Sequence, residues 1–549
     1  APGYGLSLEI FITPAGAPSV CQLNRRFLGQ SSGPRLGEAP YQSTTMKSVL
    51  KNSLLTAAAL PALASAACIS SGDQNTINNA LQSGGNGAVV QLCANAVIQI
   101  SDQISFTADN QEISTEGYPT GSTRGTIRVA PGSSASTLIY GKNFNNIRIK
   151  NIQLDGNRPG AGLFPGGAAN IEIGGFTTGQ TVSNVASKNP RGWSCLHAIG
   201  SGDDNNPCRN VTIINNDIGP CGQSGTDASG NPQWADGVSL DCTNSLVQGN
   251  TINGPTDGGI VIFGSPGSTV TGNTIISSPD YVGFGAINLV DNEYGGSYAG
   301  VSVTNNKIQG QKLFNLGIGI GANAWSFNDP SPLKGPATVT GNTITGHVSF
   351  PIAINGWTNG ITITGNTVSG VTNPKSSFAD ASHCSSAVQS VFNQNANLIY
   401  YPPGVTGPQN LQSGFVAAPG NVTNFLCSSL PLPNSVSFNA GSLTIGPDTG
   451  PFADLHGVIA QYQGDNNVVV LQNGSPVWAS GHTLSQGCNG GCQLRFDSTG
   501  NLGTYFNGAV QWSTNTGGQG KTMVVINTAP WIQIKDGSGN VIWDTTKST

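Results

Sequence analysis

A short phrase that recurs between residues 145 and 370 constrains the fold of this chain more than any other feature. Typical copies read NVTIINNDIG, STVTGNTIIS and GITITGNTVSG. In six copies one asparagine serves as a marker, and these markers are Asn216, Asn250, Asn273, Asn306, Asn342 and Asn366. Their spacings of 34, 23, 33, 36 and 24 residues indicate a unit of about 23 residues, with loops of about ten residues added in the longer copies.

Each phrase alternates β-branched residues with small or polar ones and then turns at Asn or Gly, which indicates a strand followed by a turn. A coil of this length cannot bury its own apolar face, so coils must stack in parallel, about 4.8 Å apart. The marker asparagine tolerates left-handed backbone and can hydrogen-bond to its equivalent in the next coil. The repeats resemble the pectate-lyase-like right-handed parallel β-helix superfamily over residues 68–400. The resemblance implies an all-β fold but does not specify a reaction.

The segment that begins at Met46 has the layout of a secretory signal peptide. Lys47 and Lys51 precede an apolar run, and Ala64-Ser65-Ala66 reads as a cleavage site. We therefore expect residues 46–67 to be a signal peptide and residues 1–45 to lie outside the natural protein. The mature chain is expected to be secreted, extracellular or in the cell wall, with no membrane association, because no apolar run reaches the roughly 20 residues of a membrane helix.

Cysteines and charge agree with secretion. Of 11 cysteines, Cys21 lies upstream of the expected mature chain, which leaves an even number for disulfides. Cys488 and Cys492 are expected to pair locally. Sequons for glycosylation occur at Asn210, Asn421 and Asn473. The net charge of −5 argues against nucleic acid as a partner, so polysaccharides or mannose-containing glycans are the expected ligands.

The pattern changes after a Pro-rich stretch, residues 401–434, which is expected to be a tail and linker. The last segment, residues 435–549, has three phrases that end in tryptophan, at Trp478, Trp512 and Trp543. The signature read in its first repeat is Gln463-Gly-Asp465-Asn-Asn467-Val-Val469-Val-Leu471. It resembles the mannose-binding motif QxDxNxVxY of bulb-type lectins, with Leu471 in place of the tyrosine. The resemblance implies a β-prism that binds mannose.

The chemistry of this motif suits a hexose. Gln463, Asp465 and Asn467 at alternate positions of one strand would share a face and hydrogen-bond to sugar hydroxyls, and the resemblance adds Val469 and Leu471. In the second repeat the matching positions hold Asp497, Thr499, Asn501 and Tyr505, of which Asn501 and Tyr505 keep the motif residue. One competent site is expected; the alternative is a domain that serves packing alone.

Acidic residues gather between residues 203 and 293, and aromatic residues, including Trp193 and Trp234, flank them. This combination is typical of a glycan groove. Asp236 and Asp257 are 21 residues apart, about one coil, so we expect them on neighbouring rungs, with carboxyl groups on the order of 5 Å apart. Repulsion between them would raise the pKa of one carboxyl group, as a general acid requires.

The acid pair resembles that of β-helical polysaccharide hydrolases and predicts glycoside hydrolysis, with Asp236 and Asp257 as the acid and the base or nucleophile. Supporting roles are assigned to Asp241, Asp203, Asp204 and His197. No cofactor is required for this reaction. Asp-Gly is also a common turn, so a structural role for both aspartates stays open.

Two other functions remain open. A polysaccharide lyase or C5-epimerase acting on uronates needs a base for the C5 proton and a cation beside the carboxylate. The candidate cations are Lys188, Arg191, Arg209 and a Ca²⁺ ion held by Asp203, Asp204 and Asp241. A third reading is a non-catalytic cell-wall glycan-binding protein, in which the β-helix is a spacer.

Overall fold

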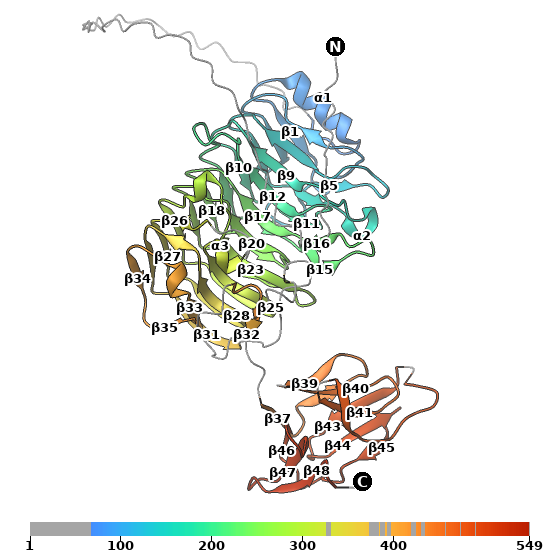
Figure 1. Ribbon diagram of the computed structural model, residues 1–549. Helices are drawn as coiled ribbons and strands as arrows, with labels where there is room; N and C mark the ends of the chain where they lie inside the picture. Colours follow the sequence, from blue (N-terminus) through green and yellow to red (C-terminus); the bar gives the residue numbers. More distant parts are fainter. Residues whose placement is uncertain are drawn as a thin grey trace, which may run out of the picture.

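The computed structural model describes residues 67–325, 331–372, 384, 390–391, 397–418, 424–429, 434–455, 457–472, 474–488 and 490–547. The chain is all-β, and its N-terminal part is a right-handed parallel β-helix, as the repeats predict. Three parallel stacks of strands run along it (Figure 1). Within the described residues, no helix has the length and apolar character that crossing a membrane requires.

The first stack forms a sheet of its own. In spatial order it contains β1 (Val89–Leu92), β4 (Glu112–Thr115), β7 (Arg148–Lys150), β10 (Thr181–Ser183), β13 (Thr212–Ile214), β18 (Leu246–Gln248), β21 (Thr269–Thr271), β24 (Val301–Thr304), β27 (Ala337–Thr340), β30 (Ile361–Thr364) and β34 (Gln409–Leu411).

The second stack begins a sheet that it shares with the third. It contains β2 (Val97–Ile100), β5 (Thr126–Val129), β8 (Gln153–Asp155), β11 (Ala186–Lys188), β14 (Asp217–Ile218), β19 (Thr251–Asn253), β22 (Thr274–Ile276), β25 (Lys307–Ile320), β28 (Thr343–Ile354) and β31 (Thr367–Thr372). The long strands β25 and β28 pair with both stacks.

The third stack carries the candidate site. It contains β3 (Ile104–Ser105), β6 (Ile139–Lys142), β9 (Ala169–Gly174), β12 (Ser194–Ile199), β17 (Asp236–Leu240), β20 (Gly258–Ile262), β23 (Val282–Leu289), then β25 and β28, and finally β33 (Leu398–Tyr400) and β35 (Phe415–Ala417). A hairpin of β15 (Gly222–Thr226) and β16 (Pro232–Trp234) projects from the corner before β17.

Alternate residues of every stack fill a continuous core of Ile, Leu and Val side chains. At the N-terminal end, helix α1 (Gln74–Gly84) places Ile77 and Leu81 in this core. Asp73 caps this helix by accepting hydrogen bonds from the backbone of Asn75 and Thr76. The helix therefore covers an end whose strands would otherwise expose their apolar face.

The marker asparagines form a ladder of hydrogen bonds, which confirms their predicted pairing between coils. The predicted left-handed backbone at the markers is wrong: it lies on the residue before each marker, such as Asn215 and Asn305. The Nδ2 of Asn250 donates to Oδ1 of Asn273 at 2.9 Å, and the same bond recurs from Asn216 through Asn366 at 2.8 to 2.9 Å. Gln412 ends the ladder, because its Oε1 accepts the bond from Asn366 at 3.0 Å. The coils are thus aligned by one buried polar row.

The segment expected to be a linker contributes to the β-helix. Strands β34 and β35 extend the first and third stacks beyond Tyr400. Phe425, Leu426 and Cys427 then pack in an apolar cluster with Phe350 and Ile399 on the outer face of the last coils. Proline content alone did not reveal this, because the strands here are only three residues long.

Ten cysteines form five disulfides. The pairs are Cys68–Cys93, Cys195–Cys221, Cys208–Cys242, Cys384–Cys427 and Cys488–Cys492. The predicted local pair is therefore confirmed. Cys21 lies outside the described residues. Five disulfides fit an oxidising compartment.

The C-terminal part has three antiparallel sheets of four strands. They are β37 (Ser435–Asn439), β46 (Thr522–Ile526), β47 (Ile532–Lys535) and β48 (Val541–Asp544); β38 (Leu443–Ile445), β43 (Cys492–Phe496), β44 (Leu502–Phe506) and β45 (Ala509–Ser513); and β39 (Pro451–Leu455), β40 (Val458–Tyr462), β41 (Val468–Gln472) and β42 (Ser475–Ala479). Trp478, Trp512 and Trp543, one from each sheet, meet with ring centroids 5.9 to 6.2 Å apart. We call this part the three-sheet domain.

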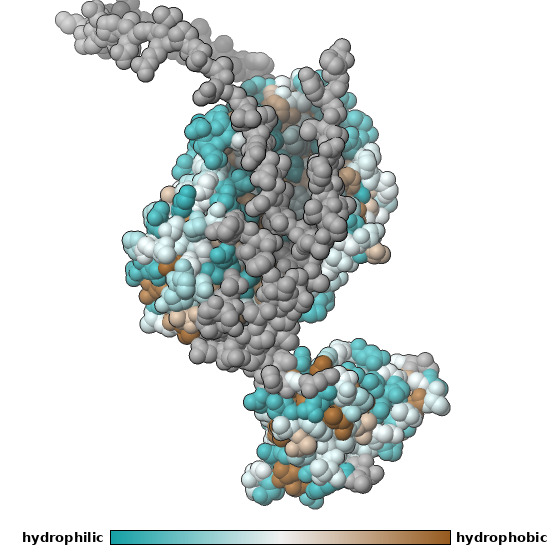
Figure 2. All heavy atoms as spheres, viewed as in Figure 1, coloured by the Kyte–Doolittle hydropathy of each residue, from teal (hydrophilic) through white to brown (hydrophobic). Residues whose placement is uncertain are grey.

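The described surface is mainly polar. On the face drawn in Figure 2, hydrophilic residues dominate both parts of the chain, and apolar residues are scattered. Large exposed apolar side chains, such as Val97, Phe176 and Val510, lie far apart in the sequence.

Candidate functional site

The third stack carries a continuous row of outward-facing side chains. Ile171, Leu196 and Val238 point into the core, so the residues that follow them in each strand point outward. The strand register places these residues side by side on successive rungs. This outer row consists of Tyr140, Glu172, His197, Ser239, Val261 and Asn288.

His197 lies in the middle of the outer row beside two aromatic rings. Its ring centroid is 4.5 Å from that of Trp193 and 6.2 Å from that of Phe263. Its Nδ1 is shielded from solvent and has no hydrogen-bond partner among the described residues. Burial, assisted by the charge of Lys142, lowers the pKa of His197 to about 3. The imidazole is therefore neutral at physiological pH, with the lone pair of one ring nitrogen unprotonated.

Glu172 and Tyr140 hold their protons to a higher pH than usual. Burial raises the pKa of Glu172, although a hydrogen bond from the Ala169 backbone, at 3.2 Å, and the charge of Lys142 oppose this. Burial and the charge of Glu172 raise the pKa of Tyr140. The row therefore places a neutral imidazole beside Glu172, with Tyr140 on the rung beyond and Lys142 as the cation that acts on both His197 and Glu172.

Asp236 begins β17 and is almost fully buried, at 4% exposure. The backbone N–H of Gly258 donates to its Oδ1, and the hydroxyl of Ser239 donates to its Oδ2, both at 2.8 Å. Burial raises the pKa of Asp236 to about 7, although both hydrogen bonds lower it. A carboxyl group near half protonation at neutral pH suits an acid, but both of its oxygens already bind the protein.

The predicted stacking of Asp236 on Asp257 is wrong in register. Val238 pairs with Ile260, a spacing of 22 residues, so Asp236 lies beside Gly258. The backbone N–H groups of Thr256 and Asp257 both donate to the carbonyl of Ala235 at 3.1 Å. Two donors on one acceptor show that this corner contains an extra residue. The Asp-Gly spacing in the sequence could not reveal it.

Asn288 is followed in register by Gly319 and Ala353, so it is the last polar side chain before apolar positions, and sequence reasoning missed it. Its amide is fully buried, and neither its nitrogen nor its oxygen has a partner among the described residues. A Cβ atom on Gly285 would lie 2.1 Å from Oδ1 of Asn288. Glycine at that position therefore makes room for the amide. An unsatisfied buried amide is costly, which marks Asn288 as a candidate for ligand contact.

The other predicted carboxylates do not join the outer row. Asp241 follows β17, and its Oδ2 accepts a hydrogen bond from the backbone of Gly200 at 2.7 Å. Burial and the charge of Glu293 raise its pKa well above the usual range. Asp203 and Asp204 lie in an exposed turn. Across the described parts of the chain no three His, Cys, Asp or Glu residues are placed to hold a metal ion, so the calcium site suggested for a lyase is not assembled here.

The predicted cations have other roles. Lys188 forms an ion pair with Asp155 at 3.8 Å. Arg191 is buried and donates to the backbone carbonyls of Ser133 and Ala135 at 2.7 and 2.6 Å. Arg209 is exposed, and its backbone bridges Thr178 and Thr243 of the neighbouring coils. Lys142, which the sequence did not single out, is the cation that acts on the outer row.

Of the two predicted aromatic residues, Trp193 lies at the outer row and Trp234 packs elsewhere. Trp193 packs edge-on against His197. Trp234, at the end of β16, lies 6.3 Å from Phe284 and packs against the apolar cluster of the last coils. Trp193 is thus the aromatic residue that shapes the outer row.

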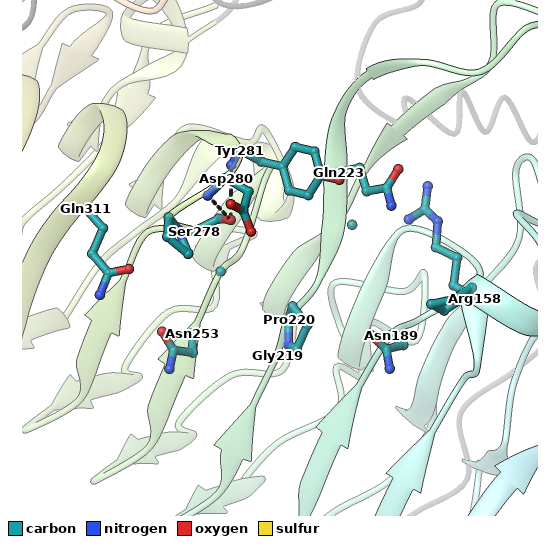
Figure 3. A pocket seen from close by; sticks show the side chains of 14 residues that line it. Arg158, Asn189, Gly219, Pro220, Gln223, Asn253, Ser278, Asp280, Tyr281 and Gln311 are labelled. Carbon is teal, nitrogen blue, oxygen red and sulfur yellow. Dashed lines mark hydrogen bonds between the residues drawn. The ribbon is translucent and has the colours of Figure 1, made fainter. Parts of the chain in front are cut away.

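A pocket of about 490 Å³ lies at the corner that follows the second stack. Figure 3 shows Arg158 on one side of it and Gln223 and Tyr281 across from it, above the strand ends that carry Asn189 and Asn253. Both terminal nitrogens of Arg158 are shielded from solvent and lack a hydrogen-bond partner among the described residues. Sequence reasoning missed this pocket, because its lining comes from six separate coils.

The lectin-like motif lies mainly in a turn, not along one strand as predicted. Strand β40 ends at Tyr462 and β41 begins at Val468. The backbone of Asn467 donates to Oδ1 of Asp465 at 3.1 Å, which stabilises the turn. The Oδ1 of Asn467 accepts hydrogen bonds from the hydroxyl of Ser480 at 2.9 Å and the backbone of Gly481 at 3.1 Å.

The remaining motif residues differ in exposure. Val469 is buried, whereas Gln463, Asp465 and Leu471 are partly exposed. Leu471 offers no hydroxyl to a ligand.

The second repeat has satisfied its own polar groups. The hydroxyl of Tyr505 donates to Oδ2 of Asp497 at 3.3 Å, and the guanidinium of Arg495 lies 4.6 Å from the centre of the Tyr505 ring. The Oδ1 of Asn501 accepts hydrogen bonds from Thr514 and Thr516. These contacts leave the first repeat as the better candidate for sugar binding.

One of the three sequons is described. Asn210 is exposed in a left-handed turn, and its Nδ2 donates to the hydroxyl of Thr178 at 3.1 Å. Asn421 and Asn473 lie outside the described residues.

A rung-by-rung alignment of core residues would have found Tyr140 and Glu172. Both lie between two buried core positions, as in Ile171-Glu172-Ile173. The marker asparagines count coils correctly, but they sit on another side of the coil. They therefore give no register for the third stack.

Comparison with protein families matches residues 137–368 to the right handed beta helix region. The comparison with curated proteins finds no match. Among solved structures, the A-module of a mannuronan C-5 epimerase from Azotobacter vinelandii is similar at 12% identity, with 64% of this chain and 97% of that chain covered and a TM-score of 0.40. An alginate lyase from a Paenibacillus species is similar at 14% identity, with 56% and 96% covered and a TM-score of 0.39.

The three-sheet domain also has similar solved structures. A monomeric monocot mannose-binding lectin from Gastrodia elata is similar at 28% identity, with 20% of this chain and 94% of that chain covered and a TM-score of 0.17. At these TM-scores the similarities carry no argument about activity, which depends on the residues described above.

Proposed function

We propose that this chain is a secreted polysaccharide-acting enzyme that removes the C5 proton of a uronate residue on the outer row. The observation that carries the proposal is the neutral His197, with its unpartnered Nδ1, between Glu172 and Ser239 and close to the charge of Lys142. Proton removal beside a carboxylate requires a base of this kind and a cation to stabilise the developing negative charge.

The reaction that fits these groups is β-elimination. The imidazole of His197 takes the proton from C5, the electron pair forms the C4–C5 double bond, and the C4–O bond breaks. The departing oxygen takes a proton from the hydroxyl of Tyr140. Lys142 faces the uronate carboxylate and lowers the energy of the charge that develops there. Return of a proton to the other face of C5 would instead give epimerisation.

The test is a screen of the secreted chain against neutral and uronic polysaccharides. Ultraviolet-absorbing ends indicate elimination, new reducing ends without absorbance indicate hydrolysis, and a changed uronate composition indicates epimerisation. We expect ultraviolet-absorbing products from a uronic polymer. Products from neutral polymers alone would contradict the proposal.

Substitution of His197 tests whether this residue is the general base. His197→Gln is expected to lower kcat by about 10²- to 10⁴-fold, because a general base contributes on this scale. The matched control is His347→Gln, because His347 is an exposed histidine on β28, and its activity should match that of the unaltered chain. Equal activity in both variants would remove His197 from the mechanism.

The pH dependence gives a second check. A histidine base with the usual pKa of about 6.5 loses activity below neutral pH, whereas the pKa of His197 is about 3. We therefore expect kcat/KM to stay nearly constant from pH 7 down to pH 5. A fall centred near pH 6.5 would show that the base is an ordinary, solvated histidine.

Hydrolysis is the second candidate, favoured by the raised pKa of Asp236. Its test is Asp236→Asn, which keeps the shape of the side chain. Under elimination at the outer row this variant should change stability and leave kcat within about threefold, because Asp236 binds Ser239 and Gly258 instead of the reacting atoms. Loss of reducing-end formation in this variant would establish the hydrolase.

The three-sheet domain is proposed to hold the enzyme on a mannose-containing glycan through Gln463, Asp465 and Asn467. Partial exposure of these three residues supports the proposal. Tethering of this kind raises the effective concentration of the outer row on an insoluble polymer. Retention on immobilised mannan that Asp465→Ala abolishes would support it. Retention without any catalytic product would instead favour the non-catalytic reading.

A further inference from the structure

The pocket beside Arg158 contains a buried cation that forms no ion pair within the described part of the chain. Arg158 begins the short helix α2 (Arg158–Ala161) and is 8% exposed. No described acidic side chain forms an ion pair with it. A guanidinium carries five N–H donors in a planar fork. Burying it unpaired is costly, and the cost is recovered when an anion occupies the pocket.

The rest of the pocket consists of groups that recognise sugar hydroxyls. Amide side chains come from Gln223, Asn189, Asn253 and Gln311, and Tyr281 adds a ring and a hydroxyl. Asp280 is exposed on the far side, and its carbonyl accepts a hydrogen bond from Lys312 at 2.7 Å. A pocket of about 490 Å³ lies within the range of sites for small ligands. Its lining therefore combines amide and hydroxyl groups with one buried cation, Arg158, and one exposed carboxylate, Asp280, on the far side.

The location links this pocket to the outer row. Asn189 follows β11 and lines the pocket, and the same corner continues through Trp193 into β12 and His197. The backbone of Arg158 donates to the carbonyl of Asn189 at 3.3 Å. One corner of one coil thus connects the Arg158 pocket to the proposed base.

We infer that the Arg158 pocket binds the carboxylate of a uronate residue, as a subsite apart from the outer row. The planar fork of Arg158 matches a carboxylate in two parallel hydrogen bonds. The surrounding amides and Tyr281 bind the hydroxyls of the same ring. This inference rests on the proposed uronate substrate, and it adds a subsite that selects charged over neutral sugars.

The experiment measures binding of sodium glucuronate, with glucose as the neutral match, by titration calorimetry. It uses the full chain carrying His197→Gln, so that no turnover occurs. Glucuronate should bind and glucose should bind at least tenfold more weakly. Arg158→Gln should weaken glucuronate binding by about tenfold or more, and Arg158→Lys should give an intermediate loss. Arg209→Gln is the matched control, because Arg209 is exposed, and should bind as the parent does.

The possible results of this experiment either support or overturn the proposed uronate subsite. Equal binding of glucuronate by the parent and by a folded Arg158→Gln variant overturns the inference, as does absence of binding in the parent. Sulfate that binds as tightly as glucuronate overturns the sugar assignment. If Arg158→Gln unfolds, Gln223→Ala, which removes a pocket amide and leaves the cation in place, should weaken glucuronate binding several-fold. If glucuronate binding depends on Arg158 but the unaltered chain yields no elimination products, the proposed reaction is wrong and the proposed subsite stands.

Discussion

The two parts of this chain use repeated asparagines in opposite ways. In the β-helix, Asn250 and Asn306 each donate to the asparagine of the next coil, so each bond joins neighbouring repeats. In the three-sheet domain, Asn467 and Asn501 accept hydrogen bonds from Ser480 and Thr514 of their own sheets. The repeats of that domain meet instead at three tryptophans.

This difference follows from geometry. Repeats related by translation have an open end, and a chain of side-chain bonds needs a residue such as Gln412 to finish it. Repeats arranged around a common core leave no open row. A β-helix can therefore concentrate its polar order in one buried ladder, whereas the three-sheet domain depends on packing at its centre.

The largest expected effect comes from removing that centre. Trp512 is 3% exposed and lies 5.9 Å from Trp478, so Trp512→Ala should cost the three-sheet domain about 3–5 kcal/mol. Calorimetry of the full chain should show a lower melting temperature for this domain and an unchanged β-helix transition. A matching shift in both transitions would mean that the two parts unfold as one unit.

Breaking the ladder should have the next largest effect. Asn306→Ala removes hydrogen bonds to Asn342 and Val270 and leaves the amide of Asn273 without its acceptor. The expected cost is about 2–3 kcal/mol in the free energy of unfolding of the β-helix. Asn410→Ala, at an exposed position of β34, is the control and should be neutral. Equal costs would show that the ladder adds nothing.

Acidification should change the stability of the β-helix and of the three-sheet domain in opposite directions. Burial raises the folded-state pKa of Asp236 to about 7. The contribution of this group to the stability of the β-helix is therefore complete below about pH 4 and is lost as the pH rises through 7. The loss is on the order of 1 kcal/mol or more. Hydrogen bonds from Asn540 and Thr546 lower the pKa values of Asp536 and Asp544. Their contribution is present above about pH 4 and is lost below it. Parallel pH profiles for the two calorimetric transitions would contradict this expectation.

The smallest expected effect is that of a single asparagine in the three-sheet domain. Asn501→Ala removes bonds to Thr514 and Thr516 within one sheet. Because the site is partly exposed, the expected loss is about 0.5–1 kcal/mol. Urea unfolding of the full chain measures it directly. A loss as large as that of Asn306→Ala would remove the distinction between bonds within a repeat and bonds between repeats.

The sequence predicted the elements that depend on periodicity. The marker asparagines, spaced by one coil, led to the ladder, and the alternation of β-branched residues led to the parallel stacks. Register at the corners depends on backbone bonds, such as the two donors on the carbonyl of Ala235, and no residue type there signals an extra position. For the same reason the pair of Asp236 and Asp257 was misplaced by one residue.

The candidate site was harder to predict than the fold. His197 and Trp193 were named, but Tyr140, Glu172 and Lys142 come from coils before the marker series begins. Arg158 belongs to a pocket whose lining comes from separate coils, so no single stretch of sequence marks it. Function in this fold depends on which residues lie side by side on successive rungs, and strand register determines that.

The ladder has a consequence for how such a protein can change over time. Its bonds stay at 2.8 to 2.9 Å although successive markers are separated by as few as 23 and as many as 36 residues. Residues can therefore be added to or removed from a corner while the neighbouring coils keep their alignment. A pocket such as the one beside Arg158, which several coils line, can change by insertion in any one of them, so the range of ligands can diversify at little cost to folding.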